Sequence, residues 1–470
     1  MASQNMPPVL PHSLLALIAK NVSDRPDFYQ TAILPLALLT GVLGFSAFPS
    51  SAAWPNGFPR FVAVYLSAWT LCVASDWLQG PYVYALYEAY GFSPHQIAQL
   101  FLAGFGAAMF CSSFVGGLAD RYGRKRGCIA YCLLCIVSCA TKHWKSYSIL
   151  MVGRITGGFA QSLLFSCFEC WMVSEHTVRN QFCSSLLPSM FGMKFSLMYL
   201  VAVISGFIAQ CGADSSSFAP VRENSLLHVG GNLVPFDMAA CVLVVALAII
   251  TIFWEENFGH AAQAEGMHFW EGLTSICHSK PLLKLGLATA CFESAMYSFV
   301  FNWTPALESA DEIPPHGVAF ALMMMACMCG ASVSSMINDT VSDLRRLQLV
   351  AGMGFGAFAV AVAALRQGAA HVCFCSFLLF EFCVGIYFPA AGSLKSKLVP
   401  ERLRVTVYNM YRVPMNAAVV SLLLTNLSTG LCFRFCCALM GILFLTTLGL
   451  LSGDEESVPE GSTKEAKACT

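Results

Sequence analysis

Long apolar runs recur along the chain, separated by short stretches rich in charge, Pro or Gly. A helix needs about 20 predominantly apolar residues to cross a bilayer, so such a run predicts a membrane-spanning helix. Twelve runs form two sets of six. The first set is Phe61–Tyr84, Ile97–Ala119, Cys128–Thr141, Tyr147–Val173, Leu187–Cys211 and Phe236–Trp254, and the second is Leu282–Thr304, Gly317–Ile337, Leu347–Leu365, His371–Leu394, Val405–Leu427 and Phe433–Leu451.

A further apolar segment, Thr31–Phe48, precedes these sets, and a polar interval with four Glu and three His, 255–280, divides them. The pattern predicts an all-α membrane protein built from two six-helix bundles related by pseudo-symmetry. The expected parts are an N-terminal extension with one extra hydrophobic helix (1–60), the first bundle (61–254), a cytosolic linker (255–280), the second bundle (281–451) and an acidic disordered tail (452–470).

Composition excludes other classes of protein. The chain has 470 residues, of which 57% are apolar and 11% are charged, whereas a soluble domain carries about 25% charged residues. Its 26 basic residues against 27 acidic ones do not provide the basic surface of a nucleic-acid-binding protein. The 22 Cys make up about five per cent of the chain, below the roughly 8 to 10% Cys typical of a disulfide scaffold.

Loop charges predict the orientation, because Lys and Arg of short loops favour the cytosol. If the first bundle helix starts in the cytosol, thirteen such residues lie inside and five outside. The inside set is Arg121, Arg124, Lys125, Arg126, Arg179, Lys280, Lys284, Arg345, Arg346, Lys395, Lys397, Arg402 and Arg404, and the outside set is Lys142, Lys145, Arg222, Arg366 and Arg434. We expect a monomer in the lipid bilayer of the plasma membrane.

The segment Thr31–Phe48 leaves two alternatives. If it spans the membrane, the N-terminus lies outside and the sequon at Asn21 is open to glycosylation; if it is amphipathic or re-entrant, Asn21 stays in the cytosol. A typical cleaved signal peptide is not expected, because no basic residue precedes the first apolar run.

Polar and charged residues occur at corresponding positions in the two sets of helices, as expected of an internal repeat. Asp76 aligns with Glu293, Arg154-x-x-x-Gly158 with Glu381-x-x-x-Gly385, Lys194 with Arg412, and Asp120-Arg121 more weakly with Asp343, Arg345 and Arg346.

The stretch from Gly116 to Lys125 reads GGLADRYGRK and fits the loop signature of the major facilitator superfamily. Small residues let helices approach, and a carboxylate can accept from a helix N-terminus or an Arg, so the loop predicts a charge–dipole latch. The predicted cytosolic gate is Gly116, Asp120, Arg121, Gly123 and Arg124. The run from Arg154 to Gly158 resembles a second element of that superfamily.

Several longer motifs resemble the eukaryotic molybdate-anion transporter family. They are SDWLQGPY from Ser75, FECW from Phe168, Phe292-Glu293 with Trp303-Thr304-Pro305, and the stretch from Gly385 to Pro414. The resemblance covers residues 61–427. It implies a secondary transporter that moves molybdate or a related oxyanion by alternating access. The chain departs from the family in the loop 212–235 and in Lys395 and Lys397, where arginines are more usual.

Ionisable groups within membrane helices are costly and are therefore candidates for function. For a substrate that is a tetrahedral dianion, the arginines Arg412 and Arg154 are the expected ligands, because guanidinium forks suit oxyanions. Gln79 and Tyr387 are candidate neutral donors. Arg412 has the alternative of a structural ion pair with Glu381 or Glu293, and Arg154 that of helix packing or proton coupling.

The acidic candidates Asp76, Glu293, Glu381 and Glu169 are expected to form ion pairs or to take up protons in coupled transport. Glu169 lies far along the helix from Arg154, so an ion pair at the inner gate is an alternative for it. Lys194 is expected to extend its side chain to the membrane interface.

No metal or cofactor is expected. The run Met323 to Cys329 offers soft ligands suited to Cu(I), but apolar helix packing explains the same residues. Cys132-x-x-Cys135 lacks a partner motif for zinc. No Walker loop or hydrolase motif occurs, so we expect no enzyme. Two rival hypotheses remain: a non-transporting membrane sensor or scaffold, and a transporter of another solute.

Overall fold

The computed structural model describes residues 27–47, 54–112, 115–183, 186–223, 225–258, 273–308, 314–338, 340–399, 404–425 and 427–451. The sequon at Asn21 and the acidic tail lie outside these ranges. The elements in chain order are α2 (Asp27–Ala47), α3 (Phe58–Gln79), α4 (Tyr82–Ala89), α5 (Pro94–Ser112), α6 (Val115–Tyr122), α7 (Arg124–Thr141), α8 (Tyr147–Ser174), the π-helix η1 (Glu175–Arg179), α9 (Leu187–Asp214), β1 (Ala219–Pro220), β2 (His228–Val229), the 3-10 helix η3 (Gly231–Leu233), α10 (Val234–Phe253), α12 (Lys280–Leu307), α13 (His316–Met336), α14 (Asp343–Gln367), α15 (Ala370–Leu398), α16 (Arg404–Leu424) and α17 (Thr429–Leu451).

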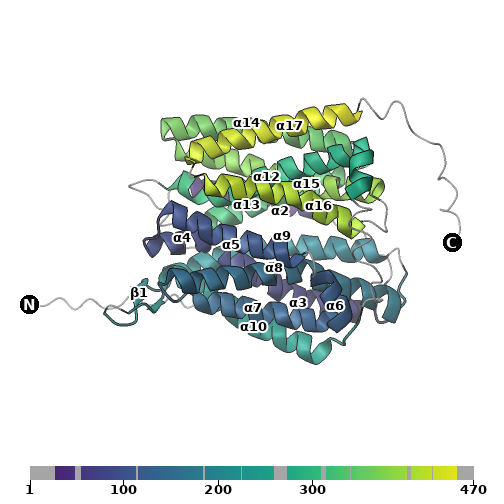
Figure 1. Cartoon of the computed structure of the whole chain (residues 1–470), viewed down its shortest axis with the longest axis horizontal. Coiled ribbons are helices and arrows are strands. Elements are labelled where there is room, and N and C mark those ends of the chain that lie inside the picture. The colour runs from purple at the N-terminus through teal and green to yellow at the C-terminus, as the bar shows by residue number, and fades with distance from the viewer. Residues whose placement is uncertain are drawn as a thin grey trace, which may run out of the picture.

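The helices form two halves that pack in the same way (Figure 1). In the N-terminal half, α8 packs on α5 and α7, and α3 packs on α9 and α10. In the C-terminal half, α15 packs on α13 and α14, and α12 packs on α16 and α17. Each pairing in one half has its counterpart in the other, which confirms the predicted pseudo-symmetric all-α membrane fold.

Eight helical segments among the described residues are long and apolar enough to cross a membrane. The four remaining predicted spans are also helical, as α5, α7, α12 and α16. The first predicted helix is interrupted between Gln79 and Tyr82, at Gly80-Pro81, because Pro lacks an amide hydrogen and its ring crowds the preceding turn.

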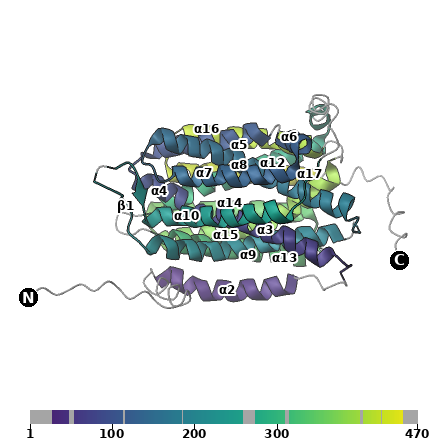
Figure 2. The same ribbon diagram turned by 90° about the horizontal axis from the view of Figure 1, so that it is seen from below.

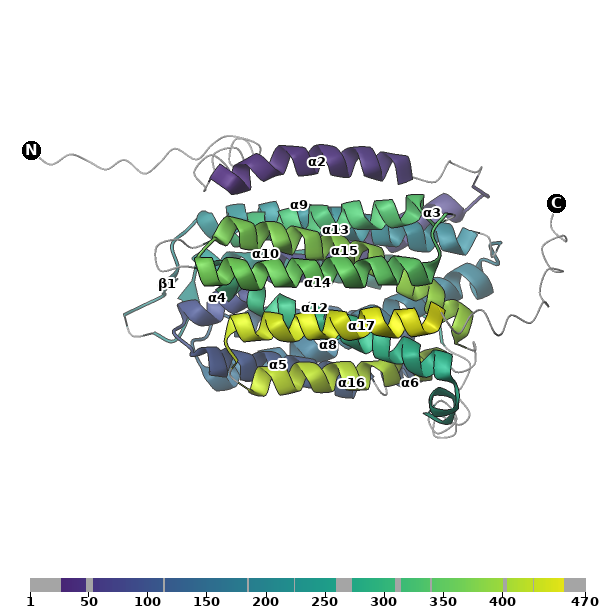
Figure 3. The ribbon, with the colours of Figure 1, turned by 90° about the horizontal axis from the view of Figure 1, so that it is seen from above.

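The extra helix α2 runs lengthwise along α13 on one side of the bundle (Figures 2 and 3). Tyr29 contacts Phe374 with ring centroids 4.9 Å apart, while Thr40 approaches Cys329 at 3.3 Å between Oγ1 and Sγ. Leu34 and Leu38 point outward and are exposed. This placement favours the spanning alternative for the N-terminal segment.

The two ends of the bundle differ. The end with α4, β1 and β2 lies opposite the end with α6 (Figure 1). Following the orientation predicted from Lys and Arg, we call them the outer and inner ends. At the outer end, β1 and β2 pair antiparallel, and His143 joins this loop to α10 through Asp237, with 2.8 Å between Nε2 and Oδ1.

The halves meet through helices α9 with α13 and α5 with α16. Gly206 and Gly317 lie where α9 and α13 cross, and a Cβ on either would overlap or crowd the carbonyl oxygen of the other. The amide of Gly317 donates to Gln210 Oε1 at 2.9 Å. Phe301 contacts Phe101 of the other half with centroids 5.3 Å apart. These contacts gather toward the outer end and form what we call the outer seal.

Candidate functional site

An ion pair in the C-terminal half joins Glu293 of α12 to Lys395 of α15, with 3.4 Å between Oε1 and Nζ. The Tyr387 hydroxyl donates to the same carboxylate oxygen at 3.2 Å, and its ring stacks on Phe292 at 3.8 Å. Lys395 Nζ lies 5.7 Å from the ring centre of Tyr408 on α16. Helices α12, α15 and α16 therefore converge on one carboxylate and one cation.

Arg412 supplies a second cation to this region. It follows Tyr408 by one helical turn, is exposed, and has no hydrogen bond or ion pair with any residue that the structure describes. Both Arg412 and Glu293 lie within electrostatic range of Tyr297, whose ring contacts Phe105 of the other half at 5.3 Å. Arg412 is thus close to the interface between the halves, and Glu293, which shares the neighbourhood of Tyr297, is paired with Lys395.

Arg154 packs against α5, in a position equivalent to that of Glu381 against α13. Arg154 Nε donates to the Leu100 carbonyl at 3.2 Å, and its guanidinium carbon lies 4.6 Å from the ring centre of Phe101. Four residues on, a Cβ at Gly158 would overlap the Gly104 carbonyl, as one at Gly385 would overlap the Cys327 carbonyl.

Glu381 is buried, and it has electrostatic contact with Cys327 of α13. The repeated charge-x-x-x-Gly pattern is therefore a helix-packing element of both halves. Glu381 and Arg412 do not form the ion pair that the sequence left open, because Glu381 faces α13 instead of α16.

Asp76 and Gln79 both lie within the N-terminal half. The Tyr131 hydroxyl donates to Asp76 Oδ1 at 3.3 Å, and Gln161 of α8 lies within interaction range of Asp76. The Gln79 amide donates to the Ser75 carbonyl at 3.0 Å. Neither residue contacts Arg154 through a described interaction, so the sequence candidates of this half do not gather at one point.

Lys194 is the clearest correction to the sequence analysis. Instead of reaching the membrane interface, it is 2% exposed and pairs with Glu169, with 2.8 Å between Nζ and Oε2. Its Nζ lies 4.5 Å from the ring centre of Trp69. Aromatic rings and a carboxylate stabilise the charge inside the bundle. Glu169 thus forms the inner-end ion pair foreseen as its alternative.

At the inner end, the predicted gate loop is tied within its own half. Gly123 has a φ of 114° and leads into α7, whose N-terminal amides of Lys125 and Arg126 donate to the Glu256 carboxylate at 2.8 and 3.3 Å. Arg124 donates to the Cys170 carbonyl at 3.2 Å.

The carboxylate on this helix N-terminus is therefore Glu256, which follows α10. Arg121 is exposed and lies over the Tyr122 ring at 5.5 Å. Gly116 and Asp120 belong to α6, but their side-chain environment lies outside what the structure describes.

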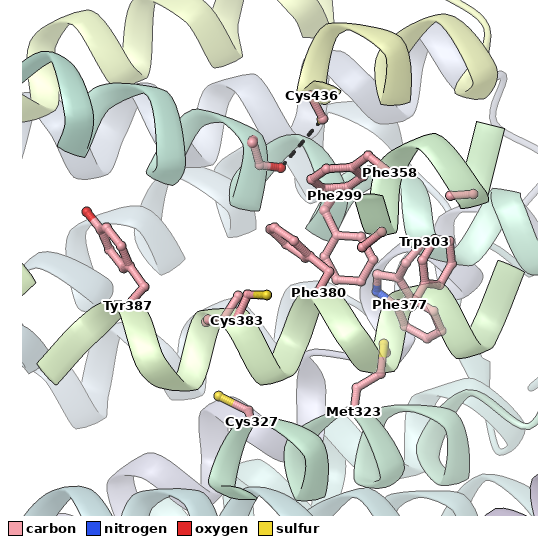
Figure 4. Packing of buried hydrophobic residues seen from close by; sticks show 14 of the residues in the cluster. Phe299, Trp303, Met323, Cys327, Phe358, Phe377, Phe380, Cys383, Tyr387 and Cys436 are labelled. Atoms are coloured by element: carbon pink, nitrogen blue, oxygen red, sulfur yellow. Dashed lines mark hydrogen bonds between the residues drawn. The ribbon is translucent and has the colours of Figure 1, made fainter. Parts of the chain in front are cut away.

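The Met- and Cys-rich run belongs to the core of the C-terminal half. Met323 and Cys327 lie among Phe299, Phe377 and Phe380 in one buried cluster (Figure 4). Aromatic and sulfur packing accounts for these residue types. Within the described ranges, no three His, Cys, Asp or Glu side chains are arranged to hold a metal ion.

Three important residues were missed by sequence reasoning. Lys395 was counted as a loop cation, although α15 extends past it to Leu398. Tyr131 reads as an ordinary apolar-helix residue, and Glu256 as part of a linker. For Lys395 the sequence offers one signal. The run after Pro389 has no further proline before Pro400, so the helix could be expected to continue and to carry the Lys395 side chain on one of its faces.

Comparisons with known proteins agree with this architecture. A family model described as sugar transporters with 12 transmembrane segments matches residues 28–366. The molybdate-anion transporters of Xenopus laevis and Xenopus tropicalis are 33% and 32% identical to the chain over 395 residues, covering 82% of this chain and 84% of each relative.

Among solved structures, a POT family transporter in complex with 5-aminolevulinic acid aligns with a TM-score of 0.66 at 13% identity. The alignment covers 87% of this chain and 99% of that one, and shows a shared fold. Multiple apolar helices make the chain a multi-pass membrane protein. Together with the identity to relatives over most of its length, this shows that the chain belongs to the molybdate-anion transporter family of the major facilitator superfamily.

Proposed function

We propose that the chain is a secondary transporter that carries molybdate, an oxyanion, across the plasma membrane by alternating access. The observation that carries the proposal is the excess of positive charge beside the interface of the halves. Lys395 is paired with Glu293, whereas Arg412, which like Glu293 lies within electrostatic range of Tyr297, has no ion-pair partner among the described residues. A dianion is stabilised by such cations in a medium of low dielectric constant. The names of the relatives supply the choice of molybdate among dianions.

Alternating access is supported by the way the halves meet. Contacts around Gly206, Gly317 and Phe301 close the interface at the outer end, and Tyr199 of α9 extends the interface to Cys327 near the middle of α13. At the inner end, the charged residues join elements of the same half: Glu256 binds the start of α7, and Asp343 binds Lys397 at 2.7 Å. Among the residues that the structure describes, the interface is closed at the outer end and no charged pair joins the halves at the inner end, which suits a carrier that rocks between two states.

Arg412 is the proposed first ligand of the oxyanion, with Lys395 as its neighbour. Asp76, Glu293, Glu381 and Glu169 remain the candidates for ion pairing or proton coupling. In this conformation the Tyr387 hydroxyl and the Gln79 amide are engaged with protein groups. The Tyr387 hydroxyl therefore orients the carboxylate of Glu293, and the Gln79 amide is held by the Ser75 carbonyl of its own helix and by Cys135 Sγ of α7. We further propose that the chain acts as a monomer and has no enzymatic activity.

Uptake of labelled molybdate into proteoliposomes tests the proposal. Arg412→Ala should lower the affinity by about tenfold to a hundredfold, the worth of a charge-assisted hydrogen bond. Arg412→Lys should retain part of it, because the charge remains. Arg434→Ala, which removes an exposed arginine of α17, is the matched control.

Wild-type uptake by Arg412→Ala would remove this residue from the site. No molybdate flux by the wild-type chain, in any ion gradient, would refute the transport proposal. Sulfate, tungstate and phosphate in the same assay identify another cargo, and microscopy of a tagged chain tests its location.

A further inference from the structure

A buried cation, Lys194, lies in the N-terminal half at the depth that the exposed Arg412 has in the C-terminal half. Lys194 follows the first residue of α9, Leu187, by seven positions, and Arg412 follows the first residue of α16, Arg404, by eight. Both therefore lie about 10 to 12 Å along equivalent helices from the inner end. The repeat brings a cation to one level in both halves.

Three aromatic rings surround the Lys194 ammonium group. Its Nζ lies 4.5 Å from the ring centre of Trp69, 5.6 Å from that of Phe191 and 5.4 Å from that of Phe195. A ring face attracts a cation electrostatically, and the attraction grows when water is excluded. With 3% of its side chain exposed, the ammonium group is fixed in position by rings that cannot themselves neutralise its charge.

Glu169 provides that neutralisation from the more open side. Its Oε2 lies 2.8 Å from Nζ, and 43% of its side chain is exposed. Lys194 is its one partner among the residues that the structure describes. A solvated anion can therefore reach the carboxylate's position without any movement of the lysine.

The pair differs from an ion pair whose role is to hold helices together. Asp343 and Arg346 are 5% and 3% exposed. Asp343 also accepts from Ser393 at 2.6 Å and from Lys397 at 2.7 Å. Such a network fixes both partners. In the Lys194 pair only the cation is fixed, and the anion is open to exchange.

We infer that Lys194 is a second oxyanion-binding cation of the transport site, which Glu169 occupies until a dianion replaces its carboxylate. The inference rests on the proposed function and extends it to the N-terminal half. A dianion held by Arg412 and Lys194 would contact both halves at one depth. The two negative charges of a dianion balance the charges of both cations, whereas the single charge of a carboxylate balances only one.

Equilibrium binding of molybdate to the purified full-length chain, measured by titration calorimetry, tests the inference. Glu169→Gln removes the competing charge and keeps the size, so the Kd should fall by roughly twofold to fivefold, as expected for release from a partly exposed ion pair. Lys194→Met should raise the Kd at least about tenfold through loss of a charge-assisted contact. Glu255→Gln, which opens the exposed inner-end pair with Arg179, should leave the Kd unchanged.

Tighter binding by Glu169→Gln is the decisive result, because a merely structural pair would lose stability without gaining affinity. If Glu169→Gln and Lys194→Met both keep the wild-type Kd while Arg412→Ala weakens binding, the inference is overturned and the proposed function stands. If the wild type binds sulfate or tungstate but not molybdate, and Glu169→Gln tightens that binding, the inference stands and the choice of molybdate fails. A wild-type chain that binds no oxyanion overturns both.

Discussion

Adding one methyl group at the outer seal should shift the balance between the two states of the carrier. In Gly206→Ala, the new Cβ would lie 2.7 Å from the carbonyl oxygen of Gly317 and 3.0 Å from the Cβ of Ala321, whereas ordinary contact begins near 3.4 Å. Helices α9 and α13 must then separate by about 0.7 Å, at a distance where dispersion attraction is steep. The same movement weakens the hydrogen bond from Gly317 to Gln210.

Overpacking of this kind costs about 1 to 3 kcal/mol. The cost falls on the state in which α9 and α13 touch, so the equilibrium should move about fivefold to 150-fold toward the state with an open outer end. Hydrogen–deuterium exchange followed by mass spectrometry measures the change. We expect faster exchange in α4 and at the start of α13, and slower exchange at the inner end.

Gly356→Ala is the matched control, because a Cβ at Gly356 of α14 would meet no atom within 4 Å. Equal exchange in the Gly206→Ala and control chains would refute the reasoning that this crossing holds the outer end closed. Faster exchange over the whole chain, with a lower unfolding temperature, would mean that the crossing supports folding and not a conformational equilibrium.

Two further predictions concern ion pairs and a helix cap, both measured by thermal unfolding of purified chains. Lys395→Met should destabilise the fold by about 2 kcal/mol, since it leaves Glu293 without its cation. Adding Glu293→Gln should restore part of this loss. Strictly additive effects of the two substitutions would show that the side chains are not coupled. Glu256→Ala should cost about 1 kcal/mol by removing the carboxylate from the α7 N-terminus, with Glu256→Gln losing less; an unchanged midpoint for Glu256→Ala would contradict that capping role.

The arrangement of helices could be predicted because the bilayer imposes it. Each long apolar run has to form a helix, since no water is available to satisfy its backbone. The predicted segments accordingly reappear in the structure, and the shared spacing of Gly158 and Gly385 marks a true packing repeat. Hydropathy alone gives the first helix as one segment, because Gly80-Pro81 stays within an apolar run, and only Pro81 itself predicts a kink there.

The partners of the charged residues could not be predicted, because they depend on helix rotation. Successive side chains of a helix point about 100° apart, so an error of one position changes which neighbouring helix a side chain is expected to face. Lys194 illustrates the problem: its position near a helix end suggested the membrane interface, but it turns toward Trp69 and Glu169. Likewise, Lys395 belongs to a helix that continues past the expected membrane boundary.

The pseudo-symmetry that governs packing is broken by charge, and this asymmetry has a mechanical consequence. Equivalent positions hold Arg154 in one half and Glu381 in the other. Lys194 and Arg412 lie at the same depth but differ in exposure, because Lys194 is buried beside Glu169 and Arg412 is exposed. Under the proposed mechanism, an incoming dianion meets Arg412 first and reaches Lys194 only by displacing a carboxylate. Binding then completes in the order C-terminal half, N-terminal half. Closure of the inner end becomes favourable only after the second contact forms. Until then one charge of the dianion has no cation beside it, and an unpaired charge is costly in a medium of low dielectric constant.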